Sequence, residues 1–137
     1  MNKIVLMPEI QAFIDDVEKN TETPLYELSY EEARAVLRGA QNMSVRQEEA
    51  DIEDTTFMVY DNHEIPVRIV RPSGAAGFLP VIFYIHGGGW VMGDANTHER
   101  LIRELAAKTG AAVIFPVYTP SPEAQYPQPV EELYGAL

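Results

Sequence analysis

The sequence predicts an α/β domain in which two helices and a β-hairpin precede two parallel strands that are buried on both faces. Residues 81–85 and 111–117 are uninterrupted apolar runs, which is typical of strands covered on both sides. Between them, residues 97–109 repeat apolar side chains at helical spacing, as a crossover helix does in a βαβ unit. The 137-residue chain is 46% hydrophobic and 23% charged, a composition that favours a folded globular domain.

Two amphipathic helices are predicted ahead of the sheet. Residues 8–19 carry apolar side chains on one helical stripe, namely Ile10, Phe13, Ile14 and Val17. Residues 29–38 are predicted to form the second helix, because Ser29 followed by Glu32 is the pattern of a capping box. Residues 41–53 are polar and acidic, and they are predicted to be a linker.

A β-hairpin is predicted after this linker, because the spacing of apolar residues changes from helical to alternating. Residues 55–60 are rich in β-branched and aromatic side chains, and residues 61–63 are a turn signal. Residues 64–71 alternate apolar and polar side chains, as the second strand of a hairpin does. Residues 72–77, rich in glycine and alanine, are predicted to form the loop that leads to the first buried strand.

The C-terminal segment is predicted to be a loop and a helix. Residues 118–128 are rich in proline, and Pro129 is well placed to begin the helix. The sequence ends within this helix, with no capping residue and no following strand, so we expect the chain to be part of a longer protein. In that protein, later strands are expected to pair beside residues 111–117.

Charge and composition exclude several classes of protein. The net charge is −11, of which −10 lies in residues 1–65 and −1 in residues 66–137. This excess argues against nucleic acid or an anionic membrane as a partner, because phosphates would repel it. The sequence has no cysteine, which excludes disulfides, thiolate metal sites and a cysteine nucleophile. It also has no signal-peptide core and no apolar stretch of membrane-spanning length, so we expect a soluble, cytoplasmic protein.

The segment His86-Gly87-Gly88-Gly89-Trp90 carries the strongest chemical signal, because it follows the first buried strand, where ligands bind in open α/β sheets. Consecutive glycines let the backbone approach a ligand with its N–H groups free, at a cost in chain entropy. Such N–H groups stabilise the oxyanion of an acyl-transfer intermediate. The alternative is a packing turn between strand and helix. Phosphate binding is disfavoured, because neither a dinucleotide fingerprint nor a P-loop motif is present.

This segment and the residues after it resemble the hormone-sensitive-lipase-like branch of the α/β-hydrolases, the "fold-3" carboxylesterases that include bacterial acetyl esterases. The matching residues are 81–90, Gly93-Asp94, His98-Glu99-Arg100, Leu105-Ala106, Pro116-Val117-Tyr118, Pro122-Glu123 and Tyr126-Pro127. The family often has Tyr-Arg-Leu-Ala-Pro-Glu in the proline-rich loop, and Thr119 stands here at the arginine position, which puts the ion pair of that arginine in question. The resemblance implies the N-terminal part of an α/β-hydrolase fold, with residues 1–50 as a helical, cap-like segment and residues 51–137 as an incomplete core.

The resemblance also implies roles for the glycine segment. The backbone N–H groups of Gly87, Gly88 and Gly89 would form part of an oxyanion hole. His86 would orient the loop through its ring nitrogens, and Trp90 would line the pocket for a short acyl chain. The implied reaction is hydrolysis of a small-molecule ester through a serine acyl-enzyme, with neither a cofactor nor a metal. The oligomeric state is left open.

No member of a catalytic triad is identified in the sequence. The family's nucleophile lies in G-x-S-x-G, and none of the serines has that context: Ser29, Ser44, Ser73 and Ser121. His63, His86 and His98 all precede the point at which that serine would fall, and His98 is expected to be a water-exposed residue at a helix start. We therefore interpret the chain as the N-terminal part of an esterase, inactive by itself. The alternative is a complete, non-catalytic binding module that reuses half of a hydrolase sheet.

Overall fold

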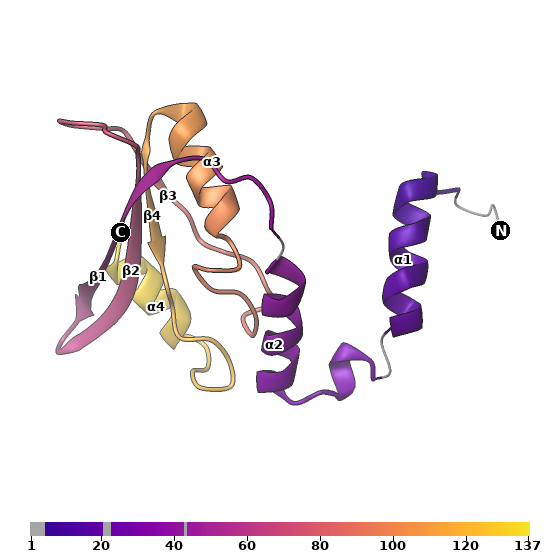
Figure 1. Cartoon of the computed structure of the whole chain (residues 1–137). Helices are drawn as coiled ribbons and strands as arrows, with labels where there is room; N and C mark the ends of the chain where they lie inside the picture. Colours follow the sequence, from indigo (N-terminus) through magenta and orange to yellow (C-terminus); the bar gives the residue numbers. More distant parts are fainter. Residues whose placement is uncertain (1–4, 21–22, 43) are drawn as a thin grey trace.

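The computed structural model describes residues 5–20, 23–42 and 44–137 (Figure 1). The helices are α1 (Pro8–Asn20), α2 (Tyr30–Gln41), α3 (Glu99–Thr109) and α4 (Gln128–Gly135), with a short 3-10 helix η1 (Leu25–Glu27). The strands are β1 (Ala50–Tyr60), β2 (His63–Pro72), β3 (Val81–Phe83) and β4 (Ala112–Pro116). The predicted order of helices, hairpin and β-α-β-α is therefore confirmed.

The strands form one mixed sheet in the order β1-β2-β4-β3. β3 and β4 are parallel and are joined through α3, which confirms the predicted βαβ unit. β2 pairs antiparallel with both β1 and β4. The expectation that later strands pair beside residues 111–117 is wrong, because β4 already has β2 on one side and β3 on the other. In this order the short strand β3 lies at an edge, so β3, and not β4, has a side open to a further strand. The sequence could not show this, because strand order depends on pairing between distant segments.

Two apolar clusters cover the two faces of this sheet. Val113 and Phe115 of β4 join Ile102 and Ala106 of α3 in one cluster. Ile114, between them in sequence, belongs instead to the cluster completed by Ala136, the residue after α4. Because alternate residues of a strand point to opposite faces, α3 and the C-terminal helix segment cover opposite sides of the sheet. Burial on both faces explains why β4 reads as a continuous apolar run.

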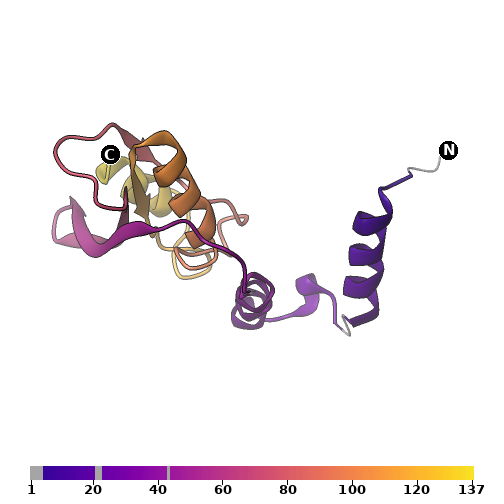
Figure 2. The same cartoon turned by 45° about the horizontal axis from the view of Figure 1, so that its top comes forward.

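The N-terminal helices are present, but they differ in how they meet the sheet. The capping box of α2 is confirmed: the Glu32 N–H donates to Ser29 Oγ at 3.3 Å, and the Ser29 N–H donates to the Glu32 carboxylate at 2.9 Å. In Figures 1 and 2, α2 lies beside the loop between β3 and α3, whereas α1 stands away from the sheet. The apolar stripe of α1 stays largely exposed, with Phe13 at 66%.

Part of the predicted linker is strand. β1 begins at Ala50, opposite Pro72, and so takes in residues whose acidic character predicts a linker. An edge strand with one face in water accommodates such residues, since every second side chain is solvated. Among the helices of the described ranges, none is both long and apolar enough to cross a membrane.

Candidate functional site

The glycine segment forms a tight loop at the carboxyl end of β3. Backbone angles φ are positive at Gly88 (129°), Gly89 (63°), Trp90 (63°) and Gly93 (98°). The Gly88 carbonyl accepts hydrogen bonds from the N–H groups of the third and fourth residues after it, at 3.2 and 2.9 Å, and so closes the turn. Glycine is favoured at such angles because a residue with a Cβ is strained there. Trp90 adopts such an angle although it has a side chain, so its backbone is strained.

Two of these glycines are also required by close approach. A Cβ on Gly88 would collide with the Met92 carbonyl, and one on Gly93 would lie 2.7 Å from Nδ1 of His86. A Cβ on Gly87 would meet nothing within 4 Å. The loop therefore folds back on itself at two points, and a side chain at either would displace its backbone.

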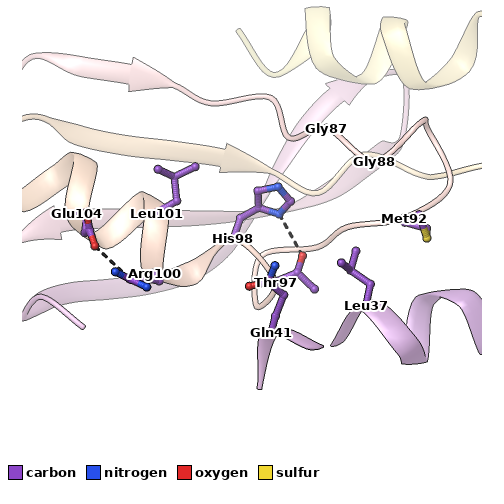
Figure 3. Close-up of a pocket in the computed structure, with 10 residues that line it drawn as sticks. All are labelled: Leu37, Gln41, Gly87, Gly88, Met92, Thr97, His98, Arg100, Leu101 and Glu104. Atoms are coloured by element: carbon purple, nitrogen blue, oxygen red, sulfur yellow. Dashed lines mark hydrogen bonds and ion pairs between the residues drawn. The ribbon is translucent and has the colours of Figure 1, made fainter. Parts of the chain in front are cut away.

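The amides at the centre of the loop are free to bind a ligand. In the part of the chain that the structure describes, the N–H groups of Gly87, Gly88 and Gly89 have no hydrogen-bond acceptor. Gly87 and Gly88 line a cavity of about 560 Å³ between α2 and α3 (Figure 3). Unpaired N–H groups that face a cavity are suited to hold an anionic oxygen, which is the requirement of an oxyanion hole.

His86 is buried beneath the loop and contacts its backbone. Only 5% of the residue is exposed, and its ring stacks on Tyr118 at 4.5 Å and on Phe115 at 5.3 Å between ring centres. Nδ1 lies 2.8 Å from the Gly87 carbonyl oxygen, and the Tyr118 hydroxyl donates to the His86 carbonyl at 3.1 Å. Burial lowers the pKa of His86, with a further contribution from nearby His98, so the ring is neutral at pH 7. Because a carbonyl only accepts, Nδ1 carries the proton and donates to the loop.

The expectation for His98 is wrong. The residue precedes α3 as predicted, but its ring is half-buried and lines the cavity instead of facing open water. It packs against His86, with ring centres 5.3 Å apart, and Nδ1 lies 3.0 Å from the Thr97 hydroxyl. The helical pattern alone could not show this, because the neighbouring rings come from the segment after β3 and from β4.

Trp90 lies on the other side of the loop, beside a second cavity. This cavity has a volume of about 430 Å³ and is lined by Gly89, Trp90, Val91, Ser121, Tyr126, Pro129 and Val130. The indole packs on Tyr118 with ring centres 5.4 Å apart, and 47% of Trp90 remains exposed. The glycine loop therefore separates the two cavities, with Gly87 and Gly88 on one side and Gly89 on the other.

Arg34 of α2 is the site residue that sequence reasoning missed. Its Nε donates to the Val91 carbonyl at 2.8 Å, and Nη2 donates to the Ser121 carbonyl at 2.9 Å. The same guanidinium binds the Glu123 carboxylate through both oxygens, at 2.7 and 2.8 Å. This pairing holds the pKa of Glu123 at about 2, well below its usual range. Glu123 therefore pairs with an arginine 89 residues earlier in the chain, whereas position 119 is a threonine.

Ser121 and His63 have structural partners. The Ser121 hydroxyl donates to the Ala124 carbonyl at 3.1 Å, and the ring of His63 lies 2.9 Å from the buried carboxylate of Glu132. Over residues 5–20, 23–42 and 44–137, no serine hydroxyl is hydrogen-bonded to a histidine ring. In these ranges there is also no cluster of three or more His, Cys, Asp or Glu side chains that could hold a metal ion.

Comparison with known proteins extends this picture. Residues 82–137 match a family model described as alpha/beta hydrolase fold. A thermostable esterase from Pseudomonas putida superposes with a TM-score of 0.91 at 39% identity, over 99% of this chain and 43% of that one. Carboxylesterase NlhH of Mycobacterium tuberculosis is 36% identical over 78% of this chain and 34% of its own length. An acetyl esterase of Salmonella schwarzengrund is 48% identical over 50% of this chain and 21% of its own length.

The three likenesses cover between 50% and 99% of this chain but only 21–43% of each relative. The chain spans about two fifths of the solved esterase and about a third of the carboxylesterase. The part of this chain that matches the solved esterase contains the whole mixed sheet and the glycine loop after β3. The chain therefore has the α/β-hydrolase fold and is similar to part of an esterase of that fold.

Proposed function

We propose that residues 1–137 provide the oxyanion-binding loop of a serine carboxylic-ester hydrolase whose nucleophile and remaining triad residues lie outside this chain. The observation that carries the proposal is that the N–H groups of Gly87, Gly88 and Gly89 have no acceptor among the described residues, while Gly87 and Gly88 line a cavity of about 560 Å³. In acyl transfer, negative charge develops on the carbonyl oxygen of the ester as the nucleophile attacks. Donors that already point at that oxygen lower the barrier, because they need no reorganisation.

His86 supports this role as the residue that orients the loop. Its neutral ring donates from Nδ1 to the Gly87 carbonyl, and stacking on two aromatic rings fixes its position. A carbonyl held in this way fixes the peptide plane that it shares with the N–H of Gly88. The N–H direction is thus set before substrate arrives, which is what electrostatic stabilisation of a transition state requires.

We infer that the substrate is a small-molecule ester with a short acyl chain. Trp90 borders the cavity of about 430 Å³ beside the loop and limits the space next to Gly89. The similarity to an acetyl esterase over half of this chain points to the same substrate class. Neither a cofactor nor a metal is needed for this reaction, because a serine acyl-enzyme carries the acyl group. A cytoplasmic location, residues 1–50 as a cap-like segment and residues 51–137 as the core remain predictions.

The test is a chimera in which residues 1–137 replace the matching segment of the Pseudomonas putida esterase, hereafter the esterase chimera. We expect it to hydrolyse p-nitrophenyl acetate, whereas residues 1–137 alone show no serine-dependent turnover. A serine-reactive phosphonate counts the chimera molecules whose nucleophile is accessible, so that kcat is expressed per competent site. A chimera that folds and reacts with the phosphonate, yet shows no ester turnover, would contradict the proposed function and favour a non-catalytic binding module.

A further inference from the structure

We propose that Arg34 is a positioning residue for the oxyanion loop. Through this side chain, α2 holds the loop in place and so sets the direction of the loop amides. The inference rests on the proposed function of the glycine loop and adds a residue that the loop sequence does not contain. Arg34 uses its guanidinium in four hydrogen bonds, all to groups outside its own helix. Its orientation is therefore set by the two loops that it contacts.

The hydrogen bonds of Arg34 close a ring that joins two loops. The Ser121 N–H donates to the Trp90 carbonyl at 2.7 Å, and the Ser121 carbonyl accepts from Arg34 at 2.9 Å. Arg34 in turn binds the carbonyl of Val91, the residue next to Trp90, at 2.8 Å. The glycine loop and the proline-rich loop are thereby fixed to each other through one guanidinium.

This ring holds the loop at its most strained point. Trp90 adopts a φ of 63°, which a residue with a Cβ keeps only when its surroundings enforce it. The two carbonyls that Arg34 and Ser121 engage belong to Trp90 and to the next residue, so they restrain the backbone there. If the Arg34 contacts are removed, relaxation of Trp90 would turn the neighbouring Gly88 and Gly89 amides away from the oxyanion position.

Charge and burial indicate that the contacts of Arg34 are specific. The Arg34 side chain is only 17% exposed, and its cation is balanced by Glu123 in a bidentate pair. Arg38, one turn later on α2, offers a matched comparison because it binds Asp94 at 2.9 Å but remains 57% exposed. Arg38 touches a side chain after the loop and no loop carbonyl, so its loss removes charge from α2 without releasing the ring.

The experiment compares Arg34→Met with Arg38→Met in the esterase chimera. We expect Arg34→Met to lower kcat by roughly ten- to a hundredfold, since small displacements of a catalytic group have effects of this size. KM should change little, and Arg38→Met should stay within about twofold of the parent chimera, as expected for an exposed pair. An Arg34→Met chimera with parental kcat, or equal losses in both variants, would overturn the proposal.

A double-mutant cycle separates positioning from general stabilisation. If Arg34 acts through the loop, then Arg34→Met should reduce kcat little further once Gly88→Ala has already displaced the loop. Independent, additive losses would show that Arg34 only stabilises the fold and would overturn the proposal.

Amide hydrogen exchange tests the same inference without relying on ester turnover. In the chimera, Arg34→Met should speed exchange over residues 87–92 and leave β1 and β2 unchanged, whereas Arg38→Met should leave residues 87–92 as in the parent. If the parent chimera lacks turnover but this pattern is found, the proposed function is wrong, whereas the positioning of the loop by Arg34 is supported. If exchange over residues 87–92 is the same in both variants, Arg34 does not position the loop, whatever the activity of the chimera.

Discussion

At the scale of single residues, the loop depends on positions where a Cβ cannot be placed. The central place of Gly88 in the glycine run predicts that a Cβ there would clash with the incoming acyl group or exclude a positive φ. The φ of 129° agrees with the second reason. The structure adds a third, because the Cβ would strike the Met92 carbonyl of the same loop.

Gly88→Ala in the esterase chimera should therefore lower kcat by roughly a hundredfold or more, or about 3 kcal/mol, which is typical of losing one oxyanion donor. KM should change much less, because the donors act on the transition state. Gly39→Ala is the control outside the loop, since its Cβ also meets nothing within 4 Å. Steady-state kinetics with circular dichroism decides this prediction. A parental kcat in Gly88→Ala would show that the loop is a packing turn.

The Arg34–Glu123 pair predicts a dependence of stability on acid. The pKa of Glu123 is lowered from 4.5 to about 2, so the folded state favours the ionised carboxylate. This contribution is fully present above pH 4.5, and it is lost as the pH falls toward 2. In urea titrations of the chimera, Glu123→Gln should be less stable than the parent at pH 6, and the difference should shrink as the pH falls toward 2. A constant difference across that range would contradict the pairing.

At the scale of elements, the two helical glycines have opposite environments. A Cβ on Gly39 in α2 would meet nothing within 4 Å, whereas a Cβ on Gly135 in α4 would strike the Val59 carbonyl of β1. The helix backbone therefore approaches β1 closely at Gly135, which fixes how α4 covers its face of the sheet.

Gly39→Ala should raise the free energy of unfolding of the chimera by about 0.5–1 kcal/mol, because alanine loses less entropy in a helix. Gly135→Ala should lower it by about 1–3 kcal/mol, because α4 must move off the strand. Chemical denaturation of the two variants in parallel provides the measurement. Equal effects of the same sign would show that α4 does not pack on β1 as described.

At the scale of the whole molecule, apolar side chains lie exposed over several elements. They include Phe13, Phe78, Val81, Ile85, Tyr126, Tyr134 and Leu137. Val81 belongs to β3, the short strand at one edge of the sheet, so unpaired backbone groups and apolar surface coincide there. Exposed strands and patches of this kind are normally covered by a further element or a partner.

Residues 1–137 in isolation should therefore bind a hydrophobic dye such as ANS and unfold over a broad temperature range. In the esterase chimera, dye binding should fall and the transition should sharpen, because further strands and helices cover the sheet. Dye fluorescence and calorimetry on the two proteins at equal concentration test this. A sharp transition without dye binding in monomeric residues 1–137 would refute it.

Short-range patterns in the sequence are sufficient to predict the element types, the parallel βαβ unit and the location of the glycine loop. These patterns are the apolar runs, the helical spacing, the Ser29 capping box and the three adjacent glycines. The place of β4 between β2 and β3 depends on tertiary pairing. A buried strand has the same apolar sequence whichever two strands lie beside it. The role of Arg34 is likewise invisible in the sequence, because its partners at 91, 121 and 123 are distant along the chain and two of them are backbone carbonyls. Any residue can supply a carbonyl, so no residue pattern marks such a contact, and only the folded chain brings it to the arginine.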